Sequence, residues 1–193
     1  MKYLHYLNKT KINEVGNRHS NTIEIANNLT LVDVHVPNGF ATNDEAYLEF
    51  LHTDDLKNKI NNILGDSNLN DSRILNHKGE EIRELILNTS IPKDILSELS
   101  LAYDKLSNYY NPDEFDTAIR DTAKSINEKS YIDVKGVDLL YKKVHESYAS
   151  LFTNRAIHYR YIRGYNHFSF SAKFIIHLKE KKLDEKYIHR AVA

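Results

Sequence analysis

Helical spacing of apolar residues is the feature that most constrains this chain. Between Asp44 and Tyr110, apolar side chains recur every three or four positions, as they do along one face of an α-helix. Gly65 ends one helical segment, and Pro92 requires another to end before it. We therefore predict three or four helices here, the first of them capped by Thr42 or Asn43.

Alternation of apolar and polar residues predicts strands on both sides of this helical stretch. The run at 29–36 alternates in this way and ends at Pro37. Further candidate strands lie at 115–119, 131–134 and 168–176, and two further helices lie at 137–152 and 156–162. The predicted fold class is α+β, with a small mixed sheet packed with several helices. We expect residues 1–193 to form a single domain, with its helical portion at about 44–110.

Composition excludes several classes of protein. The chain has no cysteine, so it can hold neither a disulfide framework nor a thiolate metal site. Its 26 Lys and Arg balance 27 Asp and Glu, so bulk charge does not attract it to nucleic acid or to anionic lipid. No window approaches the roughly eighteen apolar residues of a membrane span, and the first residues lack a leader pattern. We expect a cytoplasmic protein with neither a nucleic-acid nor a membrane partner.

The sequence contains no recognisable motif for a metal site, a phosphate-binding loop or a catalytic nucleophile. The 10 histidines include no HExxH, no HxH and no pair four apart on a predicted helix, so we assign no metal site. No glycine-rich phosphate loop is present, and the isolated glycines beside a cation favour turns, namely Gly16, Gly79, Gly136 and Gly164. No catalytic residue is assigned, because a triad is defined by geometry and not by spacing.

The late helix interleaves arginines with tyrosines, which leaves two interpretations open. The residues are Arg155, Arg160 and Arg163 with Tyr159, Tyr161 and Tyr165. Such a pattern occurs on nucleic-acid-binding faces, where bases stack on aromatic rings. It also occurs on an amphipathic helix whose basic side is solvated. The near-neutral net charge favours the second interpretation.

Three sets of motifs follow one another along the chain. The first set is VGNRHSN at 15–21, VPNGFAT at 36–42 and EAYLEFL at 45–51. The second is EIRELIL at 81–87 with Ile91 and Pro92. The third is VKGVDLL at 134–140, ASLFTNRAIHYR at 149–160 and GYNH at 164–167. Together and in this order they resemble the N-terminal part of the nucleotide-binding domain of phosphoenolpyruvate synthase and its relatives, pyruvate phosphate dikinase and rifampin phosphotransferase, whose matching patterns are VGGKNAS, VPxGFAT and ASLFTDRAISYR.

This resemblance implies the first lobe of an ATP-grasp fold, in which ATP with Mg²⁺ lies between two subdomains. Arg18 stands where the family has the lysine of GGK, and Arg120 stands where it has the arginine of VRSSA. Both positions keep a cation, and a guanidinium can grip phosphate with two hydrogen bonds. We therefore predict Arg18 and Arg120 as nucleotide-binding residues, although two arginines in ordinary surface ion pairs would give the same sequence.

Departures from the family pattern predict a weakened site. The glycine-containing loop that follows VRSSA in the family shrinks here to 120–131, which holds no glycine. Asp121 brings a negative charge next to Arg120, and Asn17 replaces the second glycine of GGK. The chain also stops before the family's second lobe, with its acidic metal ligands and adenine-side residues. We expect binding of ATP with Mg²⁺ to be weak or lost.

Two functions follow as hypotheses. The first is a truncated, degenerate binding or regulatory module that does not catalyse alone, with a protein partner or a second copy covering the surface left by the missing lobe. The second is the ATP-binding subunit of a split phosphotransferase of the phosphoenolpyruvate synthase type, completed by another chain. A gene remnant without a selected function is a third reading that one sequence leaves open.

Overall fold

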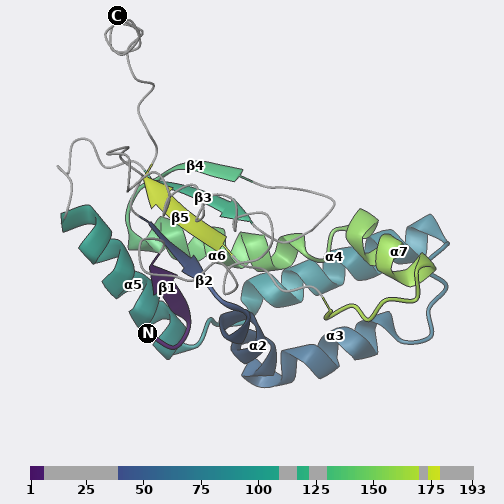
Figure 1. Cartoon of the computed structure of the whole chain (residues 1–193). Helices are drawn as coiled ribbons and strands as arrows, with labels where there is room; N and C mark the ends of the chain where they lie inside the picture. The colour runs from purple at the N-terminus through teal and green to yellow at the C-terminus, as the bar shows by residue number, and fades with distance from the viewer. Residues whose placement is uncertain (7–38, 109–116, 122–129, 170–173, 179–193) are drawn as a thin grey trace, which may run out of the picture.

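The computed structural model describes residues 1–6, 39–108, 117–121, 130–169 and 174–178. Within these ranges one antiparallel sheet packs against helices (Figure 1), so the predicted α+β class, the class expected of a first ATP-grasp lobe, is confirmed. The expected strand at 29–36, Phe115 at the start of another, and Arg18 lie outside the described residues.

Within the described ranges, five strands form the sheet, in the spatial order β1-β2-β5-β3-β4. Their bounds are Leu4–Tyr6 (β1), Gly39–Thr42 (β2), Thr117–Asp121 (β3), Ser130–Val134 (β4) and Phe174–Leu178 (β5). Each described pairing is antiparallel, whereas we expected a mixed sheet. The reason is that β5, the last described strand in the chain, lies between β2 and β3 and runs antiparallel to both.

Among the described residues between β2 and β3 there are four α-helices, in the stretch where the apolar spacing predicted three or four. They are α2 (Asp44–His52), α3 (Leu56–Leu64), α4 (Ser72–Asn88) and α5 (Lys93–Asn108). Asn43 caps α2, its Oδ1 accepting the amide of Ala46 at 3.1 Å. A short 3₁₀ turn, η4 (Thr53–Asp55), separates α2 from α3 because Asp54 and Asp55 adopt φ of 50° and 59°.

Two further helices, α6 (Val137–Ser150) and α7 (Asn154–Ile162), follow β4 and meet at Thr153, the N-cap of α7. Of the strand predicted at 168–176, the structure describes Phe174–Leu178 as β5, places Phe168 and Ser169 outside a strand, and leaves 170–173 outside the described residues. The reason is local: Asn166 Oδ1 accepts the amide of Phe168 at 2.8 Å, and its carbonyl accepts the amide of Ser169 at 3.1 Å. Phe168 therefore lies in a turn.

A single apolar cluster joins the sheet to the helices. Phe40 of β2 and Ile176 of β5 are fully buried in it. On the helical side, the rings of Phe50 and Tyr148 stack at 4.6 Å and link α2 to α6. In Figure 1, α6 runs beside the sheet, and α2 begins close to the end of β2 and leads into α3. No helix in the described ranges is long and apolar enough to cross a bilayer.

Candidate functional site

Arg120 lies in an interior strand of the sheet. β3 pairs with β4 on one side and β5 on the other, so Arg120 is held between Ser130 and Ile175. Its neighbour Ile119 pairs with Ile176, whose side chain belongs to the core. Successive residues of a strand belong to opposite faces, so position 120 belongs to the sheet face away from that core residue.

A single row of paired residues crosses all five strands at this position. It consists of His5, Ala41, Ile175, Arg120 and Ser130. Directly paired residues share a face of the sheet, so Arg120 belongs to the same face as part of the VPxGFAT motif in β2. The backbone of Arg120 is paired with a strand on each side, so its position is fixed. A fixed position suits a residue whose guanidinium has to bind phosphate.

The register also assigns Asp121 to a face of the sheet. Asp121 pairs with Phe174, which is two residues from Ile176 and shares its face. Positions 120 and 121 therefore belong to opposite faces of the sheet, and the expected effect of Asp121 on a phosphate at Arg120 stays a prediction. Arg18 lies outside the described residues, so its meeting with Arg120 stays a prediction.

Arg160 is buried, which contradicts both interpretations of the late helix at that position. Its side chain is 3% exposed. Its guanidinium donates to the carbonyl of Leu151 at 2.7 Å and to Nδ1 of His167 at 3.3 Å, and lies over the ring of Phe152 at 5.2 Å. Burial lowers the pKa of Arg160 to about 10. Arg160 thus ties α7 to the end of α6, while Arg155 and Arg163 are exposed.

A second arginine reaches the same helix end from α4. Arg83 Nη1 donates to the carbonyl of Phe152 and to Oδ1 of Asn154, both at 2.9 Å. Leu151 and Phe152 are consecutive, so two guanidinium groups hold adjacent carbonyls just beyond α6, where cations are favourable. We call these four residues, Arg83, Arg160, Leu151 and Phe152, the arginine clamp. The clamp brings the EIRELIL and ASLFTNRAIHYR motifs together in space.

Sequence reasoning missed the clamp although the signal was present. Arg160 follows the buried residues Ala156 and Ile157 by four and three positions, so helical phase puts it on the buried face of α7. Gly79 was likewise interpreted as a turn, but it lies inside α4. A Cβ there would come within 2.2 Å of Oδ1 of Asn154, so the glycine allows α4 and α7 to approach closely.

His167 closes the clamp on the side of the GYNH motif. Burial, and then the charge of Arg160, lowers its pKa to about 4. His167 is therefore neutral at physiological pH, with Nδ1 accepting from Arg160 Nε.

Nearby Tyr47 is fully buried in the core, and its hydroxyl has no hydrogen-bond partner among the described residues. Burial raises the pKa of Tyr47.

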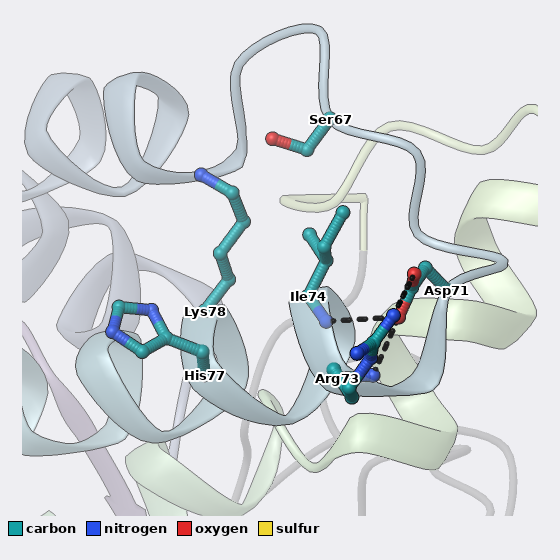
Figure 2. A pocket seen from close by; sticks show the side chains of 6 residues that line it. All are labelled: Ser67, Asp71, Arg73, Ile74, His77 and Lys78. Atoms are coloured by element: carbon teal, nitrogen blue, oxygen red, sulfur yellow. Dashed lines mark hydrogen bonds and ion pairs between the residues drawn. The ribbon is translucent and has the colours of Figure 1, made fainter.

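A shallow hollow of about 600 Å³ lies at the start of α4 (Figure 2). Its lining residues are Ser67, Asp71, Arg73, Ile74, His77 and Lys78. Arg73 already pairs with Asp71 at 3.7 Å, and Lys78 Nζ donates to the carbonyl of Ile63 at the end of α3. These cations therefore hold the α3–α4 corner, and the sheet remains the candidate region. No three His, Asp or Glu of the described ranges converge as metal ligands.

Comparison with known proteins identifies the family. Residues 12–177 match the family described as pyruvate phosphate dikinase, AMP/ATP-binding domain. The chain belongs to this family. It is 33% identical over 176 residues to the phosphoenolpyruvate synthase of Helicobacter pylori, covering 86% of this chain and 22% of that protein. The phosphoenolpyruvate synthase of Synechocystis sp. is 33% identical over 168 residues, covering 80% of this chain and 20% of that protein.

The chain therefore spans about a fifth of the length of these relatives. The matched segment contains β2, β3 and β4, every helix from α2 to α7, and both arginines of the clamp. The resemblance inferred from the three sets of motifs is thus confirmed for the pyruvate phosphate dikinase AMP/ATP-binding family.

Proposed function

We propose that this chain binds an adenine nucleotide on the sheet face to which position 120 belongs, and that its 193 residues do not transfer a phosphoryl group by themselves. It acts as a binding or regulatory module related to the nucleotide-binding domain of phosphoenolpyruvate synthase. The observation that carries the proposal is the position of Arg120 between two paired strands in a chain of an AMP/ATP-binding family.

We expect ATP binding without phosphoryl transfer because the chain contains only some of the groups that this reaction requires. Phosphoryl transfer depends on positioning and on charge neutralisation by metal ions and cations. The loop between β3 and β4 has no glycine, so its backbone cannot approach phosphates as closely as a glycine-rich loop does. Arg18 and Arg120 would supply positive charge. A cytoplasmic location is part of this proposal, and the absence of cysteine fits a reducing compartment.

Calorimetry with Mg-ATP tests the proposal. We expect weak binding that is lost in Arg120→Ala and in Arg18→Ala, and that is unchanged in Arg73→Ala. Arg73 is a matched control because its side chain is 92% exposed on α4, away from the sheet. No heat at millimolar ATP, or equal heat in all four proteins, would contradict nucleotide binding by these arginines. Formation of AMP or ADP from ATP and pyruvate would contradict the absence of turnover.

The second candidate is a split phosphotransferase, in which another chain completes the enzyme. The observation that favours it is the match of 12–177 to an AMP/ATP-binding family, together with the similarity to phosphoenolpyruvate synthases. Its test mixes this chain with the separately produced remainder of the Helicobacter pylori phosphoenolpyruvate synthase. Pyruvate-dependent ATP consumption that appears only in the mixture, and disappears with Arg120→Ala, would support this candidate over the first.

A further inference from the structure

The exposed side of α7 and the residues just after it carry arginine, tyrosine and isoleucine side chains outside the arginine clamp. Arg155, Tyr159 and Arg163 follow one another at four-residue intervals, so they form a stripe along the helix. Ile162 and Tyr165 flank the stripe and are 56% and 47% exposed. We call these five residues the α7 patch. All five residues are exposed, whereas Ala156, Ile157 and Arg160 form the buried face of α7, and Arg163 is the C-cap of this helix.

Contacts within the α7 patch hold its side chains in order. The guanidinium of Arg163 lies over the ring of Tyr159 at 5.8 Å, and the rings of Tyr159 and Tyr165 meet edge to face at 6.1 Å. Ordered aromatic and arginine side chains lose little conformational entropy on binding. Tyr and Arg are also the residue types that dominate binding hot spots. Ile162 together with Tyr159 and Tyr165 makes a group of exposed hydrophobic side chains, and such groups often mark interaction surfaces.

Charge identifies the partner's chemistry. No Asp or Glu occurs between Glu146 and Glu180. Within the described part of the chain, neither Arg155 nor Arg163 has a carboxylate partner, although both are exposed. Two guanidinium groups beside apolar surface are complementary to a segment that combines carboxylates with an apolar side chain.

We propose that the α7 patch binds an extended, acidic and apolar segment of another protein. Arg155 and Arg163 are eight residues apart on α7, which corresponds to roughly 12 Å along the helix axis. Residues four apart in an extended chain are separated by about 13 Å, and the residue midway between them belongs to the same face. Two carboxylates in such a segment would meet the two arginines, and the apolar side chain between them would meet Tyr159 and Ile162.

Other occupants fit less well. A second copy meeting the α7 patch symmetrically would set arginines against arginines. Nucleic acid draws its affinity from many phosphate contacts, whereas this patch offers two exposed arginines. A membrane surface requires a helix with a broad apolar face, whereas Ile162 is the one exposed aliphatic residue of α7.

Fluorescence anisotropy with defined peptides tests the proposal. The probe is a labelled peptide with the core Glu-Ser-Leu-Ser-Glu. One control peptide, Glu-Leu-Ser-Ser-Glu, moves leucine to the other face, and a second replaces both Glu by Lys. We expect the full chain to bind the first peptide with a sub-millimolar Kd and both controls at least about tenfold more weakly.

Variants of the exposed residues complete the test. We expect Arg155→Glu with Arg163→Glu to lose the acidic peptide and gain the lysine peptide, and Ile162→Ser to weaken binding several-fold. Arg73→Glu, on α4, is expected to leave it unchanged. No binding at millimolar peptide, or equal binding by all variants, overturns the proposal. Binding of oligothymidylate or of phosphatidylglycerol vesicles through Arg155 and Arg163, without binding of the peptide, also overturns it.

Discussion

The guanidinium of Arg160 lies 2.7 Å from the carbonyl oxygen of Leu151. This hydrogen bond gives a carbonyl at the C-terminal end of α6 a positively charged donor from α7. The two residues belong to one motif, nine positions apart in the chain. The motif ASLFTNRAIHYR was connected with nucleotide binding only through the family resemblance. Its last arginine, Arg160, has a structural role.

Replacing Arg160 by Met removes this bond and leaves the carbonyl of Leu151 buried without its donor. Because a buried, charge-assisted hydrogen bond is lost, we expect the free energy of unfolding to fall by about 2–4 kcal/mol. Urea denaturation followed by circular dichroism measures the change. Arg163→Met is the matched control, because Arg163 is exposed on the same helix. Equal stability of the two variants would contradict a structural role for Arg160.

The two arginines of the clamp are expected to act as one unit. Arg83 and Arg160 donate to consecutive carbonyls, so losing either one frees the same helix end. We predict that unfolding free energies of Arg83→Met, Arg160→Met and the double variant are non-additive by about 0.5–3 kcal/mol. Additive losses across this double-mutant cycle would mean that the two contacts are independent.

Stability should depend on the protonation of His167. Its pKa is about 4 in the folded chain, against an ordinary value of 6.5. As pH falls from 6.5 towards 4, His167 takes up a proton in the unfolded chain but not in the folded chain. The contribution of His167 to the free energy of unfolding is therefore fully present above pH 6.5 and decreases between pH 6.5 and 4. His167 is half-buried, so solvent screens part of the effect, and we expect a loss on the order of 1 kcal/mol.

The measurement for His167 is urea denaturation at several pH values within this window. His167→Asn removes the titrating group, so the difference between the wild type and this variant should shrink as pH falls. Parallel pH profiles for the two proteins would show that His167 is not the group responsible.

Gly79→Ala should destabilise the chain although alanine favours helices. The new methyl group would lie 2.2 Å from Oδ1 of Asn154, a side chain that also accepts from Arg83 and donates to Asn76. Overpacking at such a contact costs about 1–3 kcal/mol, more than the roughly 1 kcal/mol gained in helix propensity. Thermal unfolding measures the balance, with Glu80→Ala as the exposed control. A higher melting temperature for Gly79→Ala would refute the close approach.

Helices of this fold were predictable because their signals are local. Apolar spacing identified α2 to α7, and the caps at Asn43 and Gly65 follow from side-chain and backbone chemistry at single positions. The break at Asp54 and Asp55 was not predicted, because it depends on left-handed backbone conformations that aspartate only tolerates.

Contacts between distant elements were not predictable from the pattern alone. Sheet order depends on where β5 inserts, and hydrogen bonds to Asn166 place Phe168 and Ser169 in a turn instead of the predicted strand. For the candidate site, the sequence identified Arg120 through resemblance, but the strand register assigned it a face of the sheet. Arg18 stays a prediction.

Hydrogen–deuterium exchange with and without Mg-ATP tests the central claim most directly, because it reports where the nucleotide acts. We predict that ATP slows exchange of backbone amides in β3 and β5, at 117–121 and 174–178, and that Arg120→Ala removes this protection. Protection confined to the hollow at 67–78, or no protection at saturating ATP, would contradict nucleotide binding at the sheet.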